Sequence, residues 1–140
     1  MRLSTCNGEK IEVSKELNLK KLLIAFGFGY KSSDQKEIFK QTNLVAKLLL
    51  ECRDLRITNS VYDLMMVAEG KYGGIICGGK IWDHIAPEII IKEAGGEYSD
   101  FFGKPLGYSN PLADLDKQYS IFSAAPEIHK KLQDIINKNA

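Results

Sequence analysis

The sequence is poor in the residues that mark secreted, membrane-spanning and metal-cage proteins. It has three cysteines and two histidines in 140 residues, and no two cysteines have the C-x-x-C spacing of a zinc or redox site. Three cysteines cannot all pair, which favours a reducing, cytoplasmic compartment. The first residues lack the apolar core of a signal peptide, and no apolar run approaches the roughly 18 residues of a membrane span. We therefore expect a cytoplasmic chain with no membrane partner.

An excess of charge of either sign is also missing. Lys and Arg number 19 against 18 Asp and Glu, so the formal net charge is +1. Nucleic-acid binders usually concentrate positive charge, so this balance predicts no nucleic-acid partner. The sequence also lacks internal repeats and low-complexity tracts. With 44% apolar residues and this length, we expect a single domain over residues 1–140.

What the chain does contain is an alternation of apolar runs and helical spacings. Short apolar runs predict the strands, and apolar residues at helical spacing separate them. The expected strands in the body of the chain are 22–27, 55–57, 72–77, 97–102 and 119–123, with helices after 34, 60, 84 and 126. This alternation predicts an α/β fold: a layered α/β/α domain with a mixed, largely parallel sheet of about five strands.

Turn and capping residues set the expected ends of these elements. Asn7-Gly8 suits the two-residue turn of a β-hairpin, and Ser33 or Asp34 can cap the first helix. Gly70 is a suitable stop for the second helix. Pro87 fits the third helix only in its first turn, so we expect that helix to begin near His84.

The most informative segment runs from Gly78 to Gly96. It places Asp83 where a strand and a glycine-rich turn meet the start of a helix, the edge at which α/β proteins bind ligands. A carboxylate there is a hard oxygen ligand suited to Mg²⁺. The same residue could instead cap the helix, and Trp82 could pack rather than contact a substrate. The residues alone leave both interpretations open.

Four other polar residues are weaker candidates for a catalytic or phosphate-binding role. His84 is more typical of a partly exposed residue at a helix start than of a general base, and His129 is expected on the surface. Arg56 could contact phosphate, although an ion pair with a neighbouring carboxylate is the commoner role. Ser60 has no His and Asp at recognisable positions, so a serine-hydrolase triad has no support.

Taken in order, these segments resemble the inositol monophosphatase family. Trp82-Asp83, followed by a helix and by Glu93-Ala-Gly-Gly96, is similar to the family's signature. Further segments that agree in order and spacing are Asn7–Ser14, Leu22–Gly29, Arg56–Lys71 and Ser123–Pro126. The resemblance covers essentially the whole chain and is to the family's C-terminal half.

The resemblance implies a Mg²⁺-dependent hydrolase that acts on an inositol, sugar or other small phosphate ester. It implies that Asp83 is a catalytic carboxylate and a metal ligand, and that Asn59, Ser60 and Trp82 border the substrate. The family's other metal carboxylates belong to an N-terminal half, whose Asp-Pro-x-Asp-Gly motif this chain lacks. We therefore expect a truncated form that is inactive alone and binds Mg²⁺ weakly or not at all.

Two departures from the family pattern bear on the substrate. The family's glutamate shortly before Trp-Asp is replaced by Ile76 or a glycine, and its Gly-Ser-Ala-Ala becomes Asn59-Ser-Val-Tyr62. Both make another sugar phosphate, or an ester such as histidinol phosphate, as good a candidate as inositol phosphate.

The alternative function is a non-catalytic module that binds small phosphorylated ligands or associates with a protein. In either case, the absence of the N-terminal half would expose apolar surface, and such surface drives association. The expected partner is that half or, in a homo-oligomer, a second copy of the chain.

Overall fold

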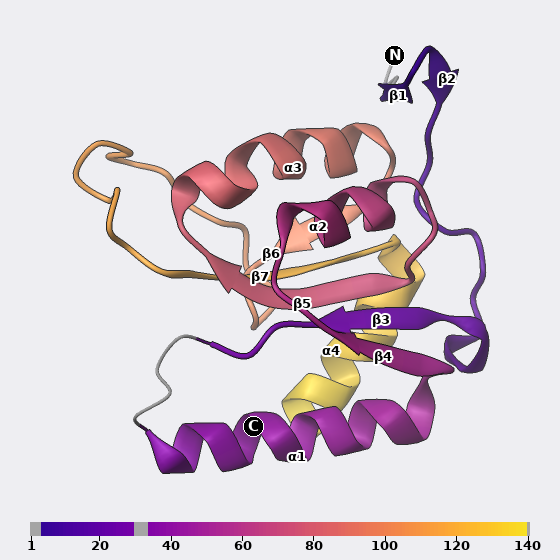
Figure 1. Cartoon of the computed structure of the whole chain (residues 1–140), viewed down its shortest axis with the longest axis vertical. Helices are drawn as coiled ribbons and strands as arrows, with labels where there is room; N and C mark the ends of the chain where they lie inside the picture. Colours follow the sequence, from indigo (N-terminus) through magenta and orange to yellow (C-terminus); the bar gives the residue numbers. More distant parts are fainter. Residues whose placement is uncertain (1–3, 30–33, 140) are drawn as a thin grey trace.

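A five-stranded mixed sheet forms the middle layer of the computed structural model, which describes residues 4–29 and 34–139 (Figure 1). Its strands lie in the order β4-β3-β5-β7-β6. They are β3 (Leu23–Phe26), β4 (Asp54–Ile57), β5 (Gly74–Gly79), β6 (Glu97–Ser99) and β7 (Tyr119–Ala124). The predicted layered α/β fold and mixed sheet are confirmed.

Parallel and antiparallel pairings each occupy one side of the sheet. β3 runs parallel to both β4 and β5, whereas β7 runs antiparallel to both β5 and β6. β7 arrives from a long loop rather than from a crossover helix, so it can insert between β5 and β6 in the opposite direction. The carboxyl ends of β4, β3 and β5 therefore meet at one edge of the sheet.

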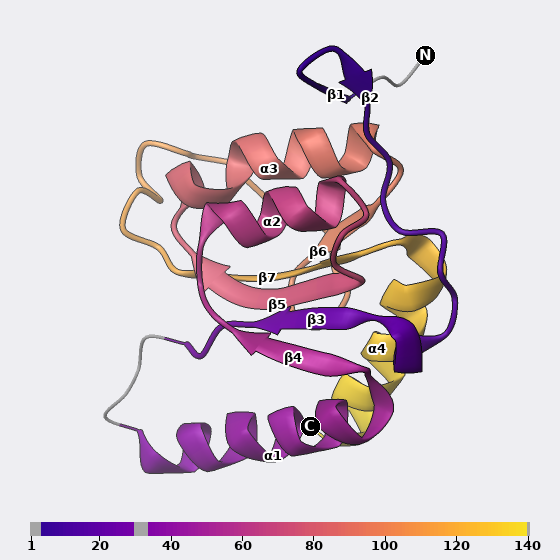
Figure 2. The same cartoon turned by 45° about the vertical axis from the view of Figure 1, so that its right-hand side comes forward.

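Helices cover both faces of this sheet in the described part of the chain. They are α1 (Gln35–Glu51), α2 (Val61–Ala68), α3 (Ile81–Glu93) and α4 (Pro126–Asn139). Figures 1 and 2 show α2 and α3 side by side on one face and α1 and α4 on the other. Alternate strand residues point to opposite faces, so the buried Ile121 packs below α2 and α3 while its neighbour Phe122 packs towards α1 and α4.

The predicted N-terminal hairpin is present between β1 (Thr5–Cys6) and β2 (Glu9–Lys10), which pair antiparallel. Asn7 and Gly8 form its turn with φ values of 52° and 85°, the left-handed geometry that a two-residue turn requires. The three cysteines are unpaired. Asp34 caps α1, as predicted, whereas the other proposed cap, Ser33, lies outside the described residues. Within the described ranges, no helix is both long and apolar enough to span a membrane.

The predicted start of α3 is wrong. The helix begins at Ile81 rather than near His84, and Pro87 lies in its interior. A proline at this position lacks the N–H that would bond to the carbonyl of Asp83, one turn earlier. Tertiary packing of α3 on α2 and the sheet outweighs that local cost. As a result, Trp82 and Asp83 lie within the first turn of the helix.

Candidate functional site

Asp83 is partly buried in the first turn of α3, and one of its oxygens caps that helix. Oδ2 accepts a hydrogen bond from the backbone N–H of Lys80 at 2.9 Å. The carboxylate packs closely on the glycine that ends β5, since a Cβ added at Gly79 would lie 3.3 Å from the Cβ of Asp83. The capping role that the residues alone suggested is therefore present. The capping hydrogen bond engages one of the two carboxylate oxygens of Asp83.

Asp83 also borders a cavity of ≈ 260 Å³ at the edge where β4 and β5 end. Asn59 and Ser60, from the turn between β4 and α2, line the same cavity, as do Cys77 and Gly78 at the end of β5. The parallel directions of β4 and β5 bring these distant segments together. Ser60 caps α2 by accepting a hydrogen bond from the N–H of Tyr62 at 3.1 Å. The starts of α2 and α3 thus meet at one cavity.

Trp82 does not line this cavity. Its side chain is 56% exposed on the outer face of α3. The ammonium of Lys80 lies 5.1 Å from the centre of the indole ring, within the range of a cation–π contact. The predicted site residues therefore divide into three that converge on one cavity and one that faces outward.

Asp63 is a site-supporting carboxylate that sequence reasoning missed. Its side chain is fully buried in the first turn of α2. Oδ2 accepts a hydrogen bond from the Thr58 hydroxyl at 3.0 Å, and Oδ1 lies 3.3 Å from Nε of Arg56. Arg56 therefore forms the ion pair with a neighbouring carboxylate that was expected for it, in preference to a contact with phosphate. The sequence feature that could have indicated Asp63 is the spacing Ser60-Val-Tyr-Asp63, which is typical of a capped helix start.

These contacts tie the turn that carries Asn59 and Ser60 to α2, and they predict an unequal response to two substitutions. Arg56→Met leaves the buried Asp63 charge without its cation and should lower the free energy of unfolding by about 2–4 kcal/mol. Asp63→Asn removes the charge, keeps an acceptor for Thr58 and should cost only about 1 kcal/mol. Urea unfolding measures both. A larger loss for Asp63→Asn would contradict this account of the pair.

Cys77 borders the cavity without offering a reactive thiolate. Burial, together with the nearby carboxylates of Asp63 and Asp83, raises the pKa of its thiol to about 12. The thiol therefore stays protonated at neutral pH and serves as a small apolar group of the core.

The expectation of a partly exposed His84 is wrong. The ring is fully buried, and its Nδ1 lies 3.2 Å from the hydroxyl of Tyr108. Tyr108 also donates a hydrogen bond to Glu88, and Glu88 pairs with Lys92 one turn later at 2.5 Å. Burial lowers the pKa of His84 below its usual value. This cluster attaches the long loop before β7 to α3, and neither His84 nor Glu88 lines the Asp83 cavity.

The expectation of a surface His129 is also wrong. The ring is partly buried, stacks on Phe122 at 4.0 Å between centroids, and places Nε2 2.9 Å from the Ser99 hydroxyl. Burial lowers its pKa, and the nearby Glu97 opposes that shift only in part.

Stability should therefore fall as the pH drops below about 6.5, the usual histidine pKa. Below that value the unfolded chain binds a proton at His129 that the folded chain resists, and each such group removes up to about 1.4 kcal/mol per pH unit. Urea unfolding between about pH 7.5 and pH 5 measures the slope. His129→Gln should reduce this slope and leave the part that the buried His84 contributes, and an identical slope in the variant would overturn the assignment.

Three comparisons with known proteins bear on this geometry. A family model described as the inositol monophosphatase family matches residues 2–139. The chain belongs to the inositol monophosphatase family. The predicted resemblance is confirmed, and the match is to the C-terminal portion of its relatives.

Among relatives in this family, the Escherichia coli protein named Nus factor SuhB is 37% identical over 99 residues, which are 69% of this chain and 36% of that protein. An Aquifex aeolicus protein named fructose-1,6-bisphosphatase/inositol-1-monophosphatase is 34% identical over 109 residues, 76% of this chain and 40% of that protein. The solved structure of an inositol monophosphatase from an Anabaena (Nostoc) species superposes with a TM-score of 0.79 at 26% identity, covering 97% of this chain and 51% of that one. The chain thus spans about half or less of the length of these relatives.

Proposed function

We propose that this chain contributes the Asp83 side of the active site of a Mg²⁺-dependent phosphomonoesterase. The observation that carries the proposal is the shared cavity of Asp83, Asn59 and Ser60 at the carboxyl edge of the parallel strands. A carboxylate is a hard ligand for Mg²⁺, and the N–H groups at the starts of α2 and α3 favour phosphate oxygens. Asp83 would hold the metal, while Asn59 and Ser60 would form part of the substrate wall.

The residues of this chain do not form a complete Mg²⁺ site by themselves. Within residues 4–29 and 34–139, no group of three or more His, Cys, Asp or Glu side chains could hold a metal ion. Mg²⁺ requires near-octahedral oxygen coordination, and a single carboxylate with one oxygen engaged in capping supplies little of it. We infer that the other ligands come from the portion of the relatives that this chain does not cover. The chain alone would then be inactive.

The cavity wall favours a phosphate ester with fewer hydroxyl groups than inositol. Val61, Leu64 and Ile121 add apolar surface to this wall beside the polar Asn59, Ser60 and Asp83. Ile76, the predicted replacement for the family's glutamate, packs into the core on the opposite face of the sheet. A sugar phosphate, or an ester such as histidinol phosphate, would leave fewer hydroxyl groups without partners on such a wall.

An association module without catalysis is a second candidate. Trp82, Ile85 and Ile89 form one stripe on the outer face of α3, with exposures of 56%, 39% and 62%. An apolar stripe at this spacing is typical of a helix face that a partner covers. The names of the relatives include both a phosphatase and a Nus factor, so a name in this family does not always state a phosphatase activity.

A reconstitution assay separates the two candidates. The purified chain is mixed with a polypeptide equivalent to the uncovered half of a relative, and turnover of p-nitrophenyl phosphate is measured with Mg²⁺. We expect no turnover by either polypeptide alone and turnover by the mixture. A folded, associated mixture without activity would favour the association module, whereas turnover by the chain alone would contradict the incomplete metal site.

A further inference from the structure

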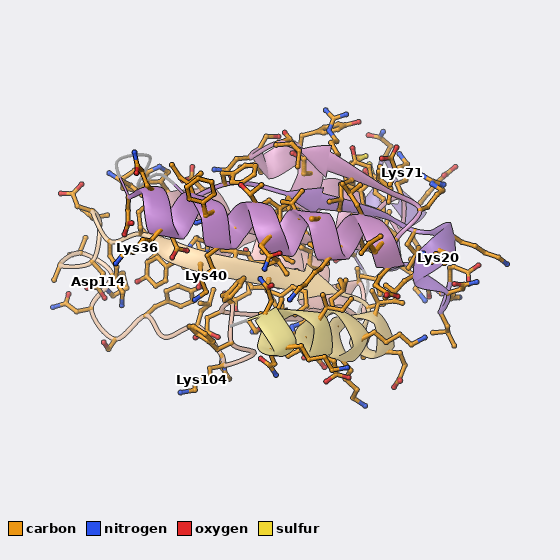
Figure 3. All side chains as sticks on the ribbon, turned by 90° about the horizontal axis from the view of Figure 1, so that it is seen from below. Lys20, Lys36, Lys40, Lys71, Lys104 and Asp114 are labelled. Atoms are coloured by element: carbon orange, nitrogen blue, oxygen red, sulfur yellow. The ribbon has the colours of Figure 1, made fainter. Side chains whose placement is uncertain are left out.

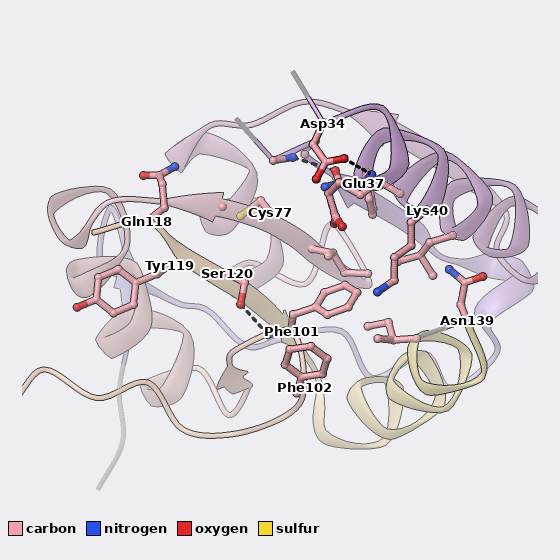
Figure 4. A pocket seen from close by; sticks show the side chains of 18 residues that line it. Asp34, Glu37, Lys40, Cys77, Phe101, Phe102, Gln118, Tyr119, Ser120 and Asn139 are labelled. Atoms are coloured by element: carbon pink, nitrogen blue, oxygen red, sulfur yellow. Dashed lines mark hydrogen bonds between the residues drawn. The ribbon is translucent and has the colours of Figure 1, made fainter. Parts of the chain in front are cut away.

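A second cavity lies on the face of the sheet opposite Asp83. It has a volume of about 510 Å³ and lies between the first half of α1, the end of α4 and the loop after β6 (Figure 4). This volume is within the range of about 300–1,000 Å³ that is typical of small-molecule sites. It shares only Cys77 and Gly78 with the Asp83 cavity, and the Cys77 side chain belongs to the core on the other face. The two cavities are therefore separate.

The base of this cavity is apolar and its mouth is aromatic. Phe26, Leu44 and Ile136 form apolar parts of the lining. The rings of Phe101 and Phe102 meet edge to face at 5.4 Å, and Phe102 is 61% exposed. Figure 4 shows both rings bordering the open space between the sheet and α4. Such a lining suits an apolar or aromatic group rather than a sugar or a phosphate.

Two opposite charges from α1 face this space without pairing with each other. Glu37 and Lys40 are three residues apart, a spacing at which such side chains commonly form ion pairs. The ion pairs of the described residues do not include one between them. Figure 4 shows both side chains directed into the cavity, with the Lys40 ammonium reaching towards Phe101.

Several other polar side chains of the lining already have hydrogen-bond partners. The Asp34 carboxylate accepts from the N–H groups of Lys36 and Glu37 and so caps α1. The Ser120 hydroxyl accepts from the N–H of Phe101 at 3.1 Å. Glu37 accepts one hydrogen bond, from Gln41 at 3.1 Å, through a single carboxylate oxygen. Among the described residues, the Lys40 ammonium and the second oxygen of Glu37 are charged groups of the lining that remain available to a ligand.

We propose that this cavity binds a free α-amino acid with an aromatic or large apolar side chain. The ligand carboxylate lies against Lys40, its ammonium lies against Glu37, and its side chain packs on Phe101 and Phe102. An α-amino acid carries opposite charges one carbon apart, which complements two unpaired charges on successive turns of one helix. This site is independent of the phosphatase proposal, since it lies across the sheet from Asp83.

L-phenylalanine is the probe, titrated into the whole chain by calorimetry and by NMR of the backbone amides. Phenylacetate and phenethylamine are the matched analogues, because each lacks one of the two charges. We expect phenylalanine to perturb the amides of Gly29, Lys40 and Ser120, and to bind at least about fivefold more tightly than either analogue. Absence of these perturbations at about 10 mM phenylalanine would overturn the proposal.

Three substitutions on α1 assign the contacts. Lys40→Met should weaken phenylalanine binding by about tenfold and leave phenethylamine unchanged, whereas Glu37→Gln should weaken phenylalanine and leave phenylacetate unchanged. Lys36→Met is the control, since Lys36 projects from the same half of α1 (Figure 3) but does not line the cavity. An equal effect of Lys36→Met, or phenylacetate binding as tightly as phenylalanine, would overturn the two-charge assignment.

Discussion

Asp83→Asn should lower the phosphatase activity proposed for the reconstituted protein by at least about 100-fold. The amide is nearly isosteric with the carboxylate but carries no charge, so it loses most of its affinity for a divalent cation. A bound metal contributes several kcal/mol to the stabilisation of the transition state, and each 1.4 kcal/mol corresponds to about tenfold in rate. Initial rates of p-nitrophenyl phosphate hydrolysis at several Mg²⁺ concentrations measure the effect.

The same substitution separates the proposed metal role of Asp83 from its capping role. The amide oxygen of Asp83→Asn can still accept the N–H of Lys80, so we expect the free energy of unfolding to change by less than about 1 kcal/mol. Asp83→Ala, in contrast, should lose both roles. If Asp83→Asn kept full activity while Asp83→Ala lost it, Asp83 would be a helix cap and the metal assignment would be wrong.

Ile85→Lys combined with Ile89→Lys should prevent association through the outer face of α3. We propose that the partner of this face is the uncovered half of the relatives or, when that half is absent, a second copy of the chain. Burial of one such side chain contributes about 1.5–3 kcal/mol, so the pair of substitutions should raise the dissociation constant by at least about 100-fold. Analytical ultracentrifugation of the chain, alone and with the other half, measures both equilibria.

Phe39→Lys is the matched control for that experiment. Phe39 is 74% exposed, more than either isoleucine, but it lies on α1, on the opposite face of the sheet. The substitution Phe39→Lys should therefore leave association unchanged. A chain that stays monomeric at high concentration and does not bind the other half would contradict the proposed role of the α3 face. Equal losses from both sets of substitutions would place the interface elsewhere.

Local sequence signals predicted those parts of the fold that depend on neighbouring residues. The Asn7-Gly8 turn, the cap at Asp34 and the helix stop at Gly70 each follow from the conformational preferences of one or two residues, and all three are present. The predicted start of α3 was wrong because it, too, was based on the preference of a single residue. Pro87 carries a local cost that argues for a later start, whereas packing against α2 and the sheet favours a longer helix.

Local sequence signals failed mainly to predict which polar residues are buried. His84 and His129 carry no mark in the sequence that separates a buried ring from an exposed one. Their partners, Tyr108 and Ser99, are 24 and 30 residues away, so only the folded chain brings them together. Asp63 is similar, because its burial depends on the packing of α2 on β5 and β7.

Local patterns were enough to predict the layered fold, the family, and Asp83 as the carboxylate at the start of a helix, because periodicity, capping residues and ordered motifs are properties of short segments. Which of those segments share a cavity depends instead on contacts between distant parts of the chain. The parallel alignment of β4 and β5 brings Asn59 and Ser60 to Asp83, and the first-turn position of Trp82 directs its ring outward. The cavity that faces Glu37 and Lys40 is likewise a product of tertiary packing, since α1, α4 and the loop after β6 meet there from distant parts of the chain.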